Sequence, residues 1–417
     1  EEGWKALRAL AERIGAPVFQ ESFGARAGFP QDHPLYAGVL PADRPGLRGR
    51  LAGYDAVLAV GAPVFRQYPY AEGPLVPKGT RVALLTDDPA EAHRAPAEVA
   101  VIAPIGPALR LLAAGVPPRP GRGAGGPALL EAAPGTDAAD ADDVHADGLR
   151  WSAAASGSGG RLGRADAGGP ATDGAPVGPP EAGPPLSSGD GDPEEQIGTE
   201  DPDGRDGSSP AASPAALRGP GERTDRPGTG TGGAALRPAD VLAALAARMD
   251  PDTVLVEETP SSRPDLHRIV PVRRPMGFLS AAMGGLGFAL PAATGVRMAA
   301  PDRPVVAVVG DGSSLYQVQA LWSAARYGAG VLFIVLSNGR YAVMDRLAER
   351  HGGKAPWPDF SQVSVAALSR GLGCAARTAA TADEVEAELD ALLPGLRERT
   401  EPVVLDVAVA PDPDFRP

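Results

Sequence analysis

Residues 304–338 place one helical segment between two apolar ones, and this unit constrains the fold more than any other part of the chain. The apolar segments are PVVAVVG (304–310) and GVLFIVLSN (330–338), and SLYQVQALWSAARYG (314–328) between them has helical apolar spacing. Two strands joined by one helix run parallel, so both strands end at the same edge of the sheet. The chain is therefore predicted to fold as α/β.

Residues 1–115 show a similar alternation and predict a first compact α/β domain. WKALRALAERIGA (4–16) has helical apolar spacing and ends at Gly15. Short apolar segments predict strands at 17–22, 55–61, 81–88 and 99–105. Apolar strands separated by helical or loop connections indicate a largely parallel sheet.

Residues 236–417 predict a second domain of the same class, built around the strand–helix–strand unit. Further helices are expected at 238–249, 342–350, 363–373 and 382–396, and further strands at 253–258 and 402–409. A glycine-rich segment, AAMGGLGFALPAATGVRMA (281–299), precedes the first apolar strand of the central unit.

The segment 116–235 differs from both flanking parts in composition. It consists largely of Gly, Pro, Ala, Asp, Ser and Thr, with almost no aromatic residues. Such a segment buries too little apolar surface to offset its conformational entropy. We therefore expect a long disordered linker joining two doubly wound parallel-sheet domains.

Charge and cysteine content exclude several classes of partner and location. The net charge is −13 and the pI is about 5.0, and there is no basic stripe, which argues against a nucleic-acid partner. Cys374 is the only cysteine, so no internal disulfide forms, and this suits a reducing cytoplasm. No run of 18 apolar residues and no leader sequence is present, so we expect a cytoplasmic protein without a membrane span.

The sequence GDGS directly follows the first strand of the central unit. Asp311 lies just after that strand, and Asn338 lies at the end of the next one, 27 residues later. Because parallel strands end at one edge, the two side chains are expected to converge. One carboxylate and one amide oxygen suit Mg²⁺, which takes few protein ligands and shares its other positions with phosphate and water.

The residues around Asp311 favour an anion beside the metal. Gly310 and Gly312 allow close approach of backbone to phosphates, and Ser313 begins a helix whose N–H groups attract negative charge. The alternative is a glycine-rich turn in which Asp311 caps a helix. The full pattern of strand, GDGS, helix, strand and Asn-Gly favours a Mg²⁺–diphosphate site.

This pattern resembles the signature of thiamine diphosphate-dependent enzymes. The resemblance extends to AAMGGLGFALPAATGV, ALWSAARYG and LSNGRYAV, and is strongest with benzoylformate decarboxylase-like members of the acetolactate synthase and pyruvate decarboxylase group. In the first domain, LAERIGAPV, FPQDHPLYAGVLP, GAPVFRQYPY and PKGTRVALLTDDPAEAHRAP resemble the middle, Rossmann-like domain of the family. The match covers 1–115 and 236–412, and it implies that 236–417 binds the cofactor's diphosphate side.

The resemblance implies a role for each residue that matches the family's motifs. Asp311, Asn338 and the backbone carbonyl of Arg340 would ligate the metal. The residues implied to contact the cofactor's diphosphate side are Gly310, Asp311, Gly312, Ser313, Asn338 and Thr259.

The other implied roles concern the cofactor's ring and the substrate. The carbonyl of Gly284 would meet the aminopyrimidine, and Leu286 would be the apolar wedge that bends the cofactor, although Leu286 alone also fits an ordinary core residue. Val343 and Leu347 would lie beside the substrate. His33, in FPQDHPLY, would be the catalytic residue for protonation steps, with a surface-loop histidine as the alternative.

The implied activity is Mg²⁺-dependent decarboxylation of a 2-oxo acid such as benzoylformate. Family members carry a further, pyrimidine-binding domain whose glutamate activates the cofactor, and no part of this sequence matches it. We expect activity to be incomplete without that domain. The resemblance implies either a homo-oligomer, as a dimer or tetramer, or a partner chain that carries the pyrimidine-binding domain.

Other functions stay open at this point. They are carboligation like that of acetolactate synthase, and a non-catalytic cofactor-binding subunit. A nucleotide-binding regulator based on 1–115 is disfavoured because GxGxxG does not follow the first strand.

Overall fold

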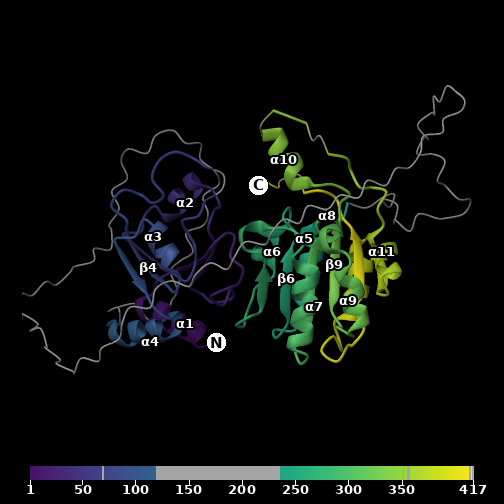
Figure 1. Ribbon diagram of the computed structural model, residues 1–417, viewed down its shortest axis with the longest axis horizontal. Helices are drawn as coiled ribbons and strands as arrows, with labels where there is room; N and C mark the ends of the chain where they lie inside the picture. Colours follow the sequence, from purple (N-terminus) through teal and green to yellow (C-terminus); the bar gives the residue numbers. More distant parts are fainter. Residues whose placement is uncertain (68–69, 119–234, 351, 355–356, 413–414, 416–417) are drawn as a thin grey trace, which may run out of the picture. The chain divides into compact units, whose positions relative to one another are not determined.

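The computed structural model describes residues 1–67, 70–118, 235–350, 352–354, 357–412 and 415. The predicted disordered linker, apart from its outermost residues 116–118 and 235, lies outside the described residues. The two described parts, 1–118 and 235–415, are each considered by themselves. Parallel strands connected by helices form both parts, which confirms the predicted α/β class (Figure 1).

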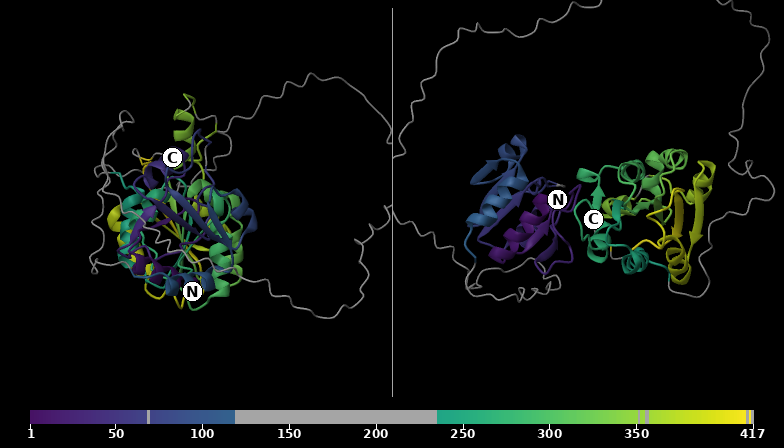
Figure 2. Two further views of the ribbon diagram at one scale, coloured as in Figure 1. Left: turned by 90° about the vertical axis from the view of Figure 1, so that its left-hand side faces the viewer. Right: turned by 90° about the horizontal axis from the view of Figure 1, so that it is seen from below.

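The C-terminal part contains a six-stranded sheet in which every pair of neighbours is parallel. Across the sheet, the strands are β10 (Ala375–Ala379), β11 (Val403–Ala408), β9 (Leu332–Ser337), β8 (Val305–Gly310), β6 (Val254–Glu258) and β7 (Phe278–Ser280). Helices cover both faces of this sheet, as the right-hand view of Figure 2 shows. The buried strands β8 and β9 lie at its centre, and their residues are those predicted to form strands.

Alternate residues of each central strand belong to two hydrophobic cores. On β8, Val306 and Val308 face one core, while Val305, Ala307 and Val309 face the other. The first core is covered by α5 (Pro238–Arg248), α6 (Arg263–Ile269) and α12 (Ala382–Leu392). The second is covered by α7 (Ala289–Ala299), α9 (Ala320–Arg326) and α11 (Val365–Gly371).

The helix predicted at 314–328 is interrupted. Instead, α8 (Asp311–Ser314) begins at the aspartate itself, a 3₁₀ turn (Leu315–Gln317) follows, and α9 begins at Ala320. The amides of Leu321 and Trp322 bond carbonyls three residues back, so the chain winds more tightly here than an α-helix. The prediction of one continuous helix was therefore wrong.

Two strands of this sheet, β7 and β10, were not predicted from the sequence. β7 has only three residues, and β10 has the sequence AARTA, which lacks the β-branched and aromatic residues typical of strands apart from one threonine. Both lie at the edges of the sheet, where pairing with a single neighbour forms the strand. Two further short elements of this part are a 3₁₀ turn (Ala282–Gly284) and α10 (Ala342–Arg350).

The N-terminal part has two parallel sheets. One pairs β1 (Val18–Gln20) with β2 (Tyr36–Val39), and the other has the order β3 (Ala56–Val60), β4 (Arg81–Thr86) and β5 (Val99–Ile102). The helices are α1 (Glu2–Ile14), α2 (Arg44–Leu51), α3 (Pro89–Arg94) and α4 (Ile105–Gly115). Helices α1 and α4 pack together around Leu10 and Leu109, while α2 packs through Leu47 against a separate core that includes Leu84. No helix of the described residues is long and apolar enough to cross a membrane.

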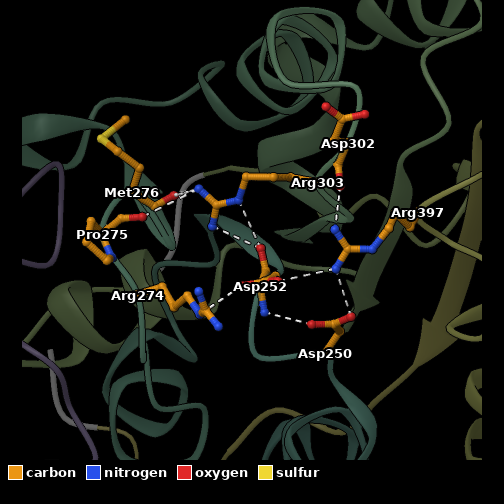
Figure 3. Close-up of polar contacts among 8 residues, drawn as sticks. All are labelled: Asp250, Asp252, Arg274, Pro275, Met276, Asp302, Arg303 and Arg397. Atoms are coloured by element: carbon orange, nitrogen blue, oxygen red, sulfur yellow. Dashed lines mark hydrogen bonds and ion pairs between the residues drawn. The ribbon is translucent and has the colours of Figure 1, made fainter. Parts of the chain in front are cut away.

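Arginines join the loops that precede the strands of the six-stranded sheet (Figure 3). The guanidinium of Arg303, just before β8, donates to the carbonyl of Asp252, just before β6, at 3.0 and 2.9 Å. Arg397 donates to the carbonyl of Asp302 and to the carboxylate of Asp250. The amino ends of the strands are thereby cross-linked, and the opposite edge carries the residues with predicted chemistry.

Candidate active site

The carboxylate of Asp311 connects the ends of β8 and β9. The two strands are direct neighbours, with Gly310 opposite Leu336. Asp311 is 6% exposed, and its Oδ1 accepts the Gly312 amide at 2.9 Å while its Oδ2 accepts the Gly339 amide at 2.6 Å. The structure therefore brings the GDGS turn and the Asn-Gly turn together at one carboxylate.

Asn338 and Arg340 line an open hollow beside this turn. The Oδ1 of Asn338 accepts the Arg340 amide at 3.0 Å, which holds the side chain against its own turn. Ser261 and Ser262, from the loop after β6, line the same hollow. Neither serine was predicted to be a site residue, although two consecutive serines in the loop that follows a buried strand could have indicated such a role.

The ligand set at this edge fits a hard dication. The carboxylate of Asp311 lies at the end of β8, and an amide oxygen and backbone carbonyls lie in the adjoining turn. In the described part of the chain, no group of three or more His, Cys, Asp or Glu side chains is arranged to hold a metal. A Mg²⁺ ion here would rest on few protein oxygens and take its other ligands from phosphate and water.

Two aromatic rings pack against the GDGS turn. Tyr341 and Phe360 lie edge to face with centroids 4.7 Å apart, and the Phe360 amide donates to the Gly339 carbonyl. A Cβ on Gly312 would lie 2.6 Å from Tyr341 and 2.8 Å from Phe360. Glycine is thus required by packing at this position. Burial raises the pKa of the Tyr341 phenol, and the neighbouring Tyr316 and the negative charge of Asp311 raise it further.

Strand β6 has two consecutive buried glutamates at its end, and neither was predicted to have a role. Glu257 is fully buried, and its carboxylate accepts from the Thr259 amide at 2.6 Å and the Ser280 hydroxyl at 2.9 Å. Arg263 forms an ion pair with it at 2.8 Å. Thr259, predicted to contact the cofactor, is 1% exposed. The signal was available, because charged residues rarely end an otherwise apolar strand without partners.

Glu258 points to the other face of the sheet and caps α7. Its carboxylate accepts the amides of Gly287, Phe288 and Ala289 at 2.7, 2.6 and 2.7 Å. Burial raises the pKa of Glu258, while the three amide donors act in the opposite direction by stabilising the charged form. The carboxylate of Glu258 therefore fixes the junction at which the glycine-rich loop ends and α7 begins.

The glycine-rich loop 283–287 holds Gly284 and Leu286 in an unusual backbone path. Met283, Gly284 and Gly287 have φ of 63°, 74° and 87°, in the left-handed region. The Leu286 side chain is 38% exposed, so the ordinary core residue considered as its alternative is not what the structure shows.

His33 lies in a packed setting in the N-terminal part. Its side chain is 12% exposed and its ring packs edge to face on Phe29 at 5.1 Å. Nδ1 accepts the Leu35 amide at 3.1 Å, so the neutral ring carries its proton on Nε2, which lies 3.0 Å from Glu12 Oε1. The histidine is therefore oriented by two hydrogen bonds, one at each ring nitrogen.

Val343 and Leu347, the predicted substrate residues, lie one turn apart on α10 and are both half-buried. The hollow beside Asn338 is lined by other positions of this helix, namely Ala342, Asp345, Arg346 and Glu349. The two apolar side chains therefore occupy a different face of α10 from the hollow-lining residues.

His267, on α6, is half-buried. Its ring packs on Phe278 with centroids 5.1 Å apart and its Nδ1 is buried. Burial lowers the pKa of His267 to about 4, with Arg263 adding to the shift and Glu257 opposing it.

Comparisons with protein families match both described parts. The model described as the central domain of thiamine pyrophosphate enzymes matches residues 1–112, and the model described as their C-terminal TPP-binding domain matches 261–407. The benzoylformate decarboxylase of Pseudomonas aeruginosa is 31% identical over 404 residues, covering 95% of this chain and 57% of that protein.

Solved structures give the same picture. The thiamine diphosphate-dependent 4-hydroxybenzoylformate decarboxylase of Rhodococcus jostii RHA1 aligns with a TM-score of 0.67 at 29% identity, covering 98% of this chain and 59% of that one. The benzoylformate decarboxylase of Polynucleobacter necessarius has a TM-score of 0.68 at 23% identity, covering 100% of this chain and 60% of that one, and supports the fold alone. The chain thus spans less than two thirds of the length of these relatives.

Proposed function

Because this chain belongs to the thiamine pyrophosphate enzyme family, we propose that it binds thiamine diphosphate with Mg²⁺ and serves the decarboxylation of a 2-oxo acid. In this proposal, residues 236–417 form the diphosphate-side binding domain and residues 1–115 the middle domain. The metal ligands are Asp311, Asn338 and the carbonyl of Arg340.

The observation that carries the proposal is the convergence of two turns on Asp311. Its carboxylate accepts amides from both the GDGS turn and the Asn-Gly turn, so one side chain fixes both turns. Gly310, Gly312 and Ser313 then present small residues and a helix N-terminus beside the ligand oxygens. This arrangement favours a metal-bridged diphosphate over an uncharged ligand.

The chain's own residues would hold the cofactor and move protons around it. When bound, thiamine diphosphate would supply the carbon that adds to the keto group and the electron sink for the electron pair that stays behind when CO₂ leaves. Gly284 and Leu286 would position the ring portion, with Thr259 behind the diphosphate. His33 would donate or accept a proton at Nε2, whose hydrogen bond to Glu12 already orients the ring.

The names of the relatives support a proposal for the substrate class. Two of them act on benzoylformate or its 4-hydroxy form, according to their names. We propose an aryl or similarly apolar 2-oxo acid, with Val343 and Leu347 beside its side chain. Turnover would also require a pyrimidine-binding domain with its activating glutamate, either from this polypeptide beyond the 417 residues or from a partner chain.

Calorimetric titration of the 417-residue chain with thiamine diphosphate, with Mg²⁺ or with EDTA, tests the binding. Wild type is expected to bind only with the metal, and Asp311→Ala to weaken binding severely because a charged ligand of a dication is lost. Glu349→Gln is the matched control, since Glu349 lines the hollow without being a proposed ligand. Equal affinity of wild type and Asp311→Ala would reject the metal assignment.

Release of CO₂ and benzaldehyde from benzoylformate tests the reaction. We expect little turnover by the chain alone and a large gain when a pyrimidine-binding domain is supplied, because an absent acid–base group removes about 10²–10⁴-fold. In the complemented enzyme, His33→Ala should lower kcat more than it changes cofactor affinity. Full activity of the chain alone would contradict the proposed need for that domain, and ligated products in place of aldehyde would show carboligation.

A further inference from the structure

The three hydrogen bonds to Glu258 are directed at the joint between the glycine-rich loop and α7. Gly287 ends the loop and Phe288 precedes the helix, so the carboxylate holds the last loop residue and the first helical turn together. Glu258 itself is 2% exposed at the end of β6, a strand paired on both sides. The loop is therefore tied at this end to a buried inner strand of the sheet.

The loop needs such an anchor because its backbone conformation is unfavourable. A methionine with φ of 63° is rare, and two left-handed glycines follow it within four residues. Residues in such conformations persist only where their surroundings fix them. At Gly287 the surroundings are close on the other side as well, because a Cβ there would lie 2.9 Å from Gln317 Cγ.

Leu286 lies directly between these constraints. Its side chain is not held by a core, since 38% of it is exposed. Its position is instead set by the backbone on either side, and the next residue, Gly287, is held by Glu258. A small movement of the Gly287 amide therefore moves the leucine.

We propose that Glu258 is a positioning residue, which fixes Leu286 and Gly284 in place for the ring portion of the cofactor through its bonds to Gly287, Phe288 and Ala289. This inference rests on the proposed function. It distinguishes Glu258 from Asp311: Asp311 serves the diphosphate end, and Glu258 serves the ring end.

A second consequence concerns the N-terminus of α7. The amide of Ala289, its first residue, and the amides of Phe288 and Gly287 just before it are already paired with a carboxylate of the chain, so this helix end does not attract the diphosphate. The charge of Glu258 would also repel an anion placed there. Loss of Glu258 should consequently affect recognition of the cofactor's ring portion and leave recognition of diphosphate alone unchanged.

Two probes separate these contributions: Mg²⁺–pyrophosphate, which has only the diphosphate portion, and Mg²⁺–thiamine diphosphate. Affinities of both are measured by calorimetry for the full chain and for Glu258→Gln, which keeps the size of the side chain but replaces one acceptor oxygen by an NH₂ group. We expect thiamine diphosphate to bind about tenfold more weakly, the effect of losing one charged hydrogen bond, and pyrophosphate to bind as in wild type.

Glu384→Gln is the matched control. Glu384 also accepts backbone amides at a helix N-terminus, from Ala380 and Thr381 at the start of α12. It should leave both affinities unchanged. If Glu258→Gln fails to fold, Gly287→Ala disturbs the same joint from the opposite side and should give the same selective loss.

A double-mutant cycle with Leu286→Ala adds a measurement that a purely stabilising role would not alter. If Glu258 acts through Leu286, the two substitutions together should weaken thiamine diphosphate binding no more than the stronger one alone. Equal weakening of both probes by Glu258→Gln, or fully additive effects in the cycle, would overturn the inference. Failure of the wild-type chain to bind even pyrophosphate would reject the proposed function and this inference with it.

Discussion

Gly312→Ala should damage the candidate site by a steric effect that can be worked out from the structure. The new methyl group would lie 2.6 Å from Tyr341 Cε1 and 2.8 Å from Phe360 Cζ, whereas ordinary contact begins at 3.4 Å. Both rings must therefore retreat, Tyr341 by at least 0.8 Å, which is the difference between 3.4 and 2.6 Å. Overpacking of this kind costs about 1–3 kcal/mol.

The effect on binding should exceed the effect on stability. Tyr341 directly follows Arg340, whose carbonyl is the proposed third ligand, and the amide of Gly312 is one of the two donors to Asp311. Movement of Tyr341 therefore displaces ligand oxygens on both turns. Chemical denaturation would measure the loss of unfolding free energy, and calorimetry with Mg²⁺–pyrophosphate would measure the loss of affinity in the folded protein.

Two results would refute this reasoning. An unchanged affinity for Mg²⁺–pyrophosphate would show that the turn around Gly312 does not hold the ligand. An unchanged unfolding free energy would show that the two aromatic rings yield without cost. Tyr341→Ala combined with Gly312→Ala should restore stability relative to Gly312→Ala alone, because it removes the closest clashing ring.

Three further predictions follow from the packing and charge of the C-terminal part. Gly330→Ala should lower the unfolding free energy by more than about 3 kcal/mol, since its Cβ would lie 1.9 Å from the backbone carbonyl of Arg399, yet affinity for Mg²⁺–pyrophosphate should persist in folded protein. His267 has a folded-state pKa of about 4, below its unfolded value of 6.5, so its contribution to stability is present above pH 6.5 and is lost as the pH falls towards 4, by about 3 kcal/mol in all. His267→Phe should flatten the pH dependence of unfolding across that range, and an identical dependence would contradict the assignment. Asp311→Asn should weaken Mg²⁺–pyrophosphate binding but not unfold the protein, as circular dichroism would show, because the asparagine Oδ1 can still accept one of the two amides.

The sequence could predict the elements whose positions follow from hydrophobic patterns in neighbouring residues. β8, β9 and the position of Asp311 between them follow from apolar strands joined by a helix, since that pattern has one common solution. Hydrophobic periodicity likewise predicted α5 and α12. Both helices begin at the predicted residue and end earlier than predicted, by a few residues at most.

Features that depend on contacts across the fold could not be predicted in the same way. β10 carries little strand propensity and pairs only because β11 presents an open edge. The role of Glu258 requires knowing that α7 begins beside the end of β6, about 30 residues further along the chain. Gly312 was predicted to be needed for phosphate approach, whereas the structure adds the packing of two aromatic rings that follow much later in the sequence.

The arginine cross-links at the amino ends of the strands influence which parts of the sequence can change during evolution. Arg303 and Arg397 bind backbone carbonyls of neighbouring loops, so these links persist whatever side chains those carbonyl-bearing residues acquire. Substitutions that retune ligand choice fall at the opposite edge, in loops that contribute little to these links. Because the stabilising arginines and the ligand-facing loops lie at opposite edges of the sheet, the loops can change in sequence while the fold stays stable. Under this condition, new substrate preferences can arise through single substitutions.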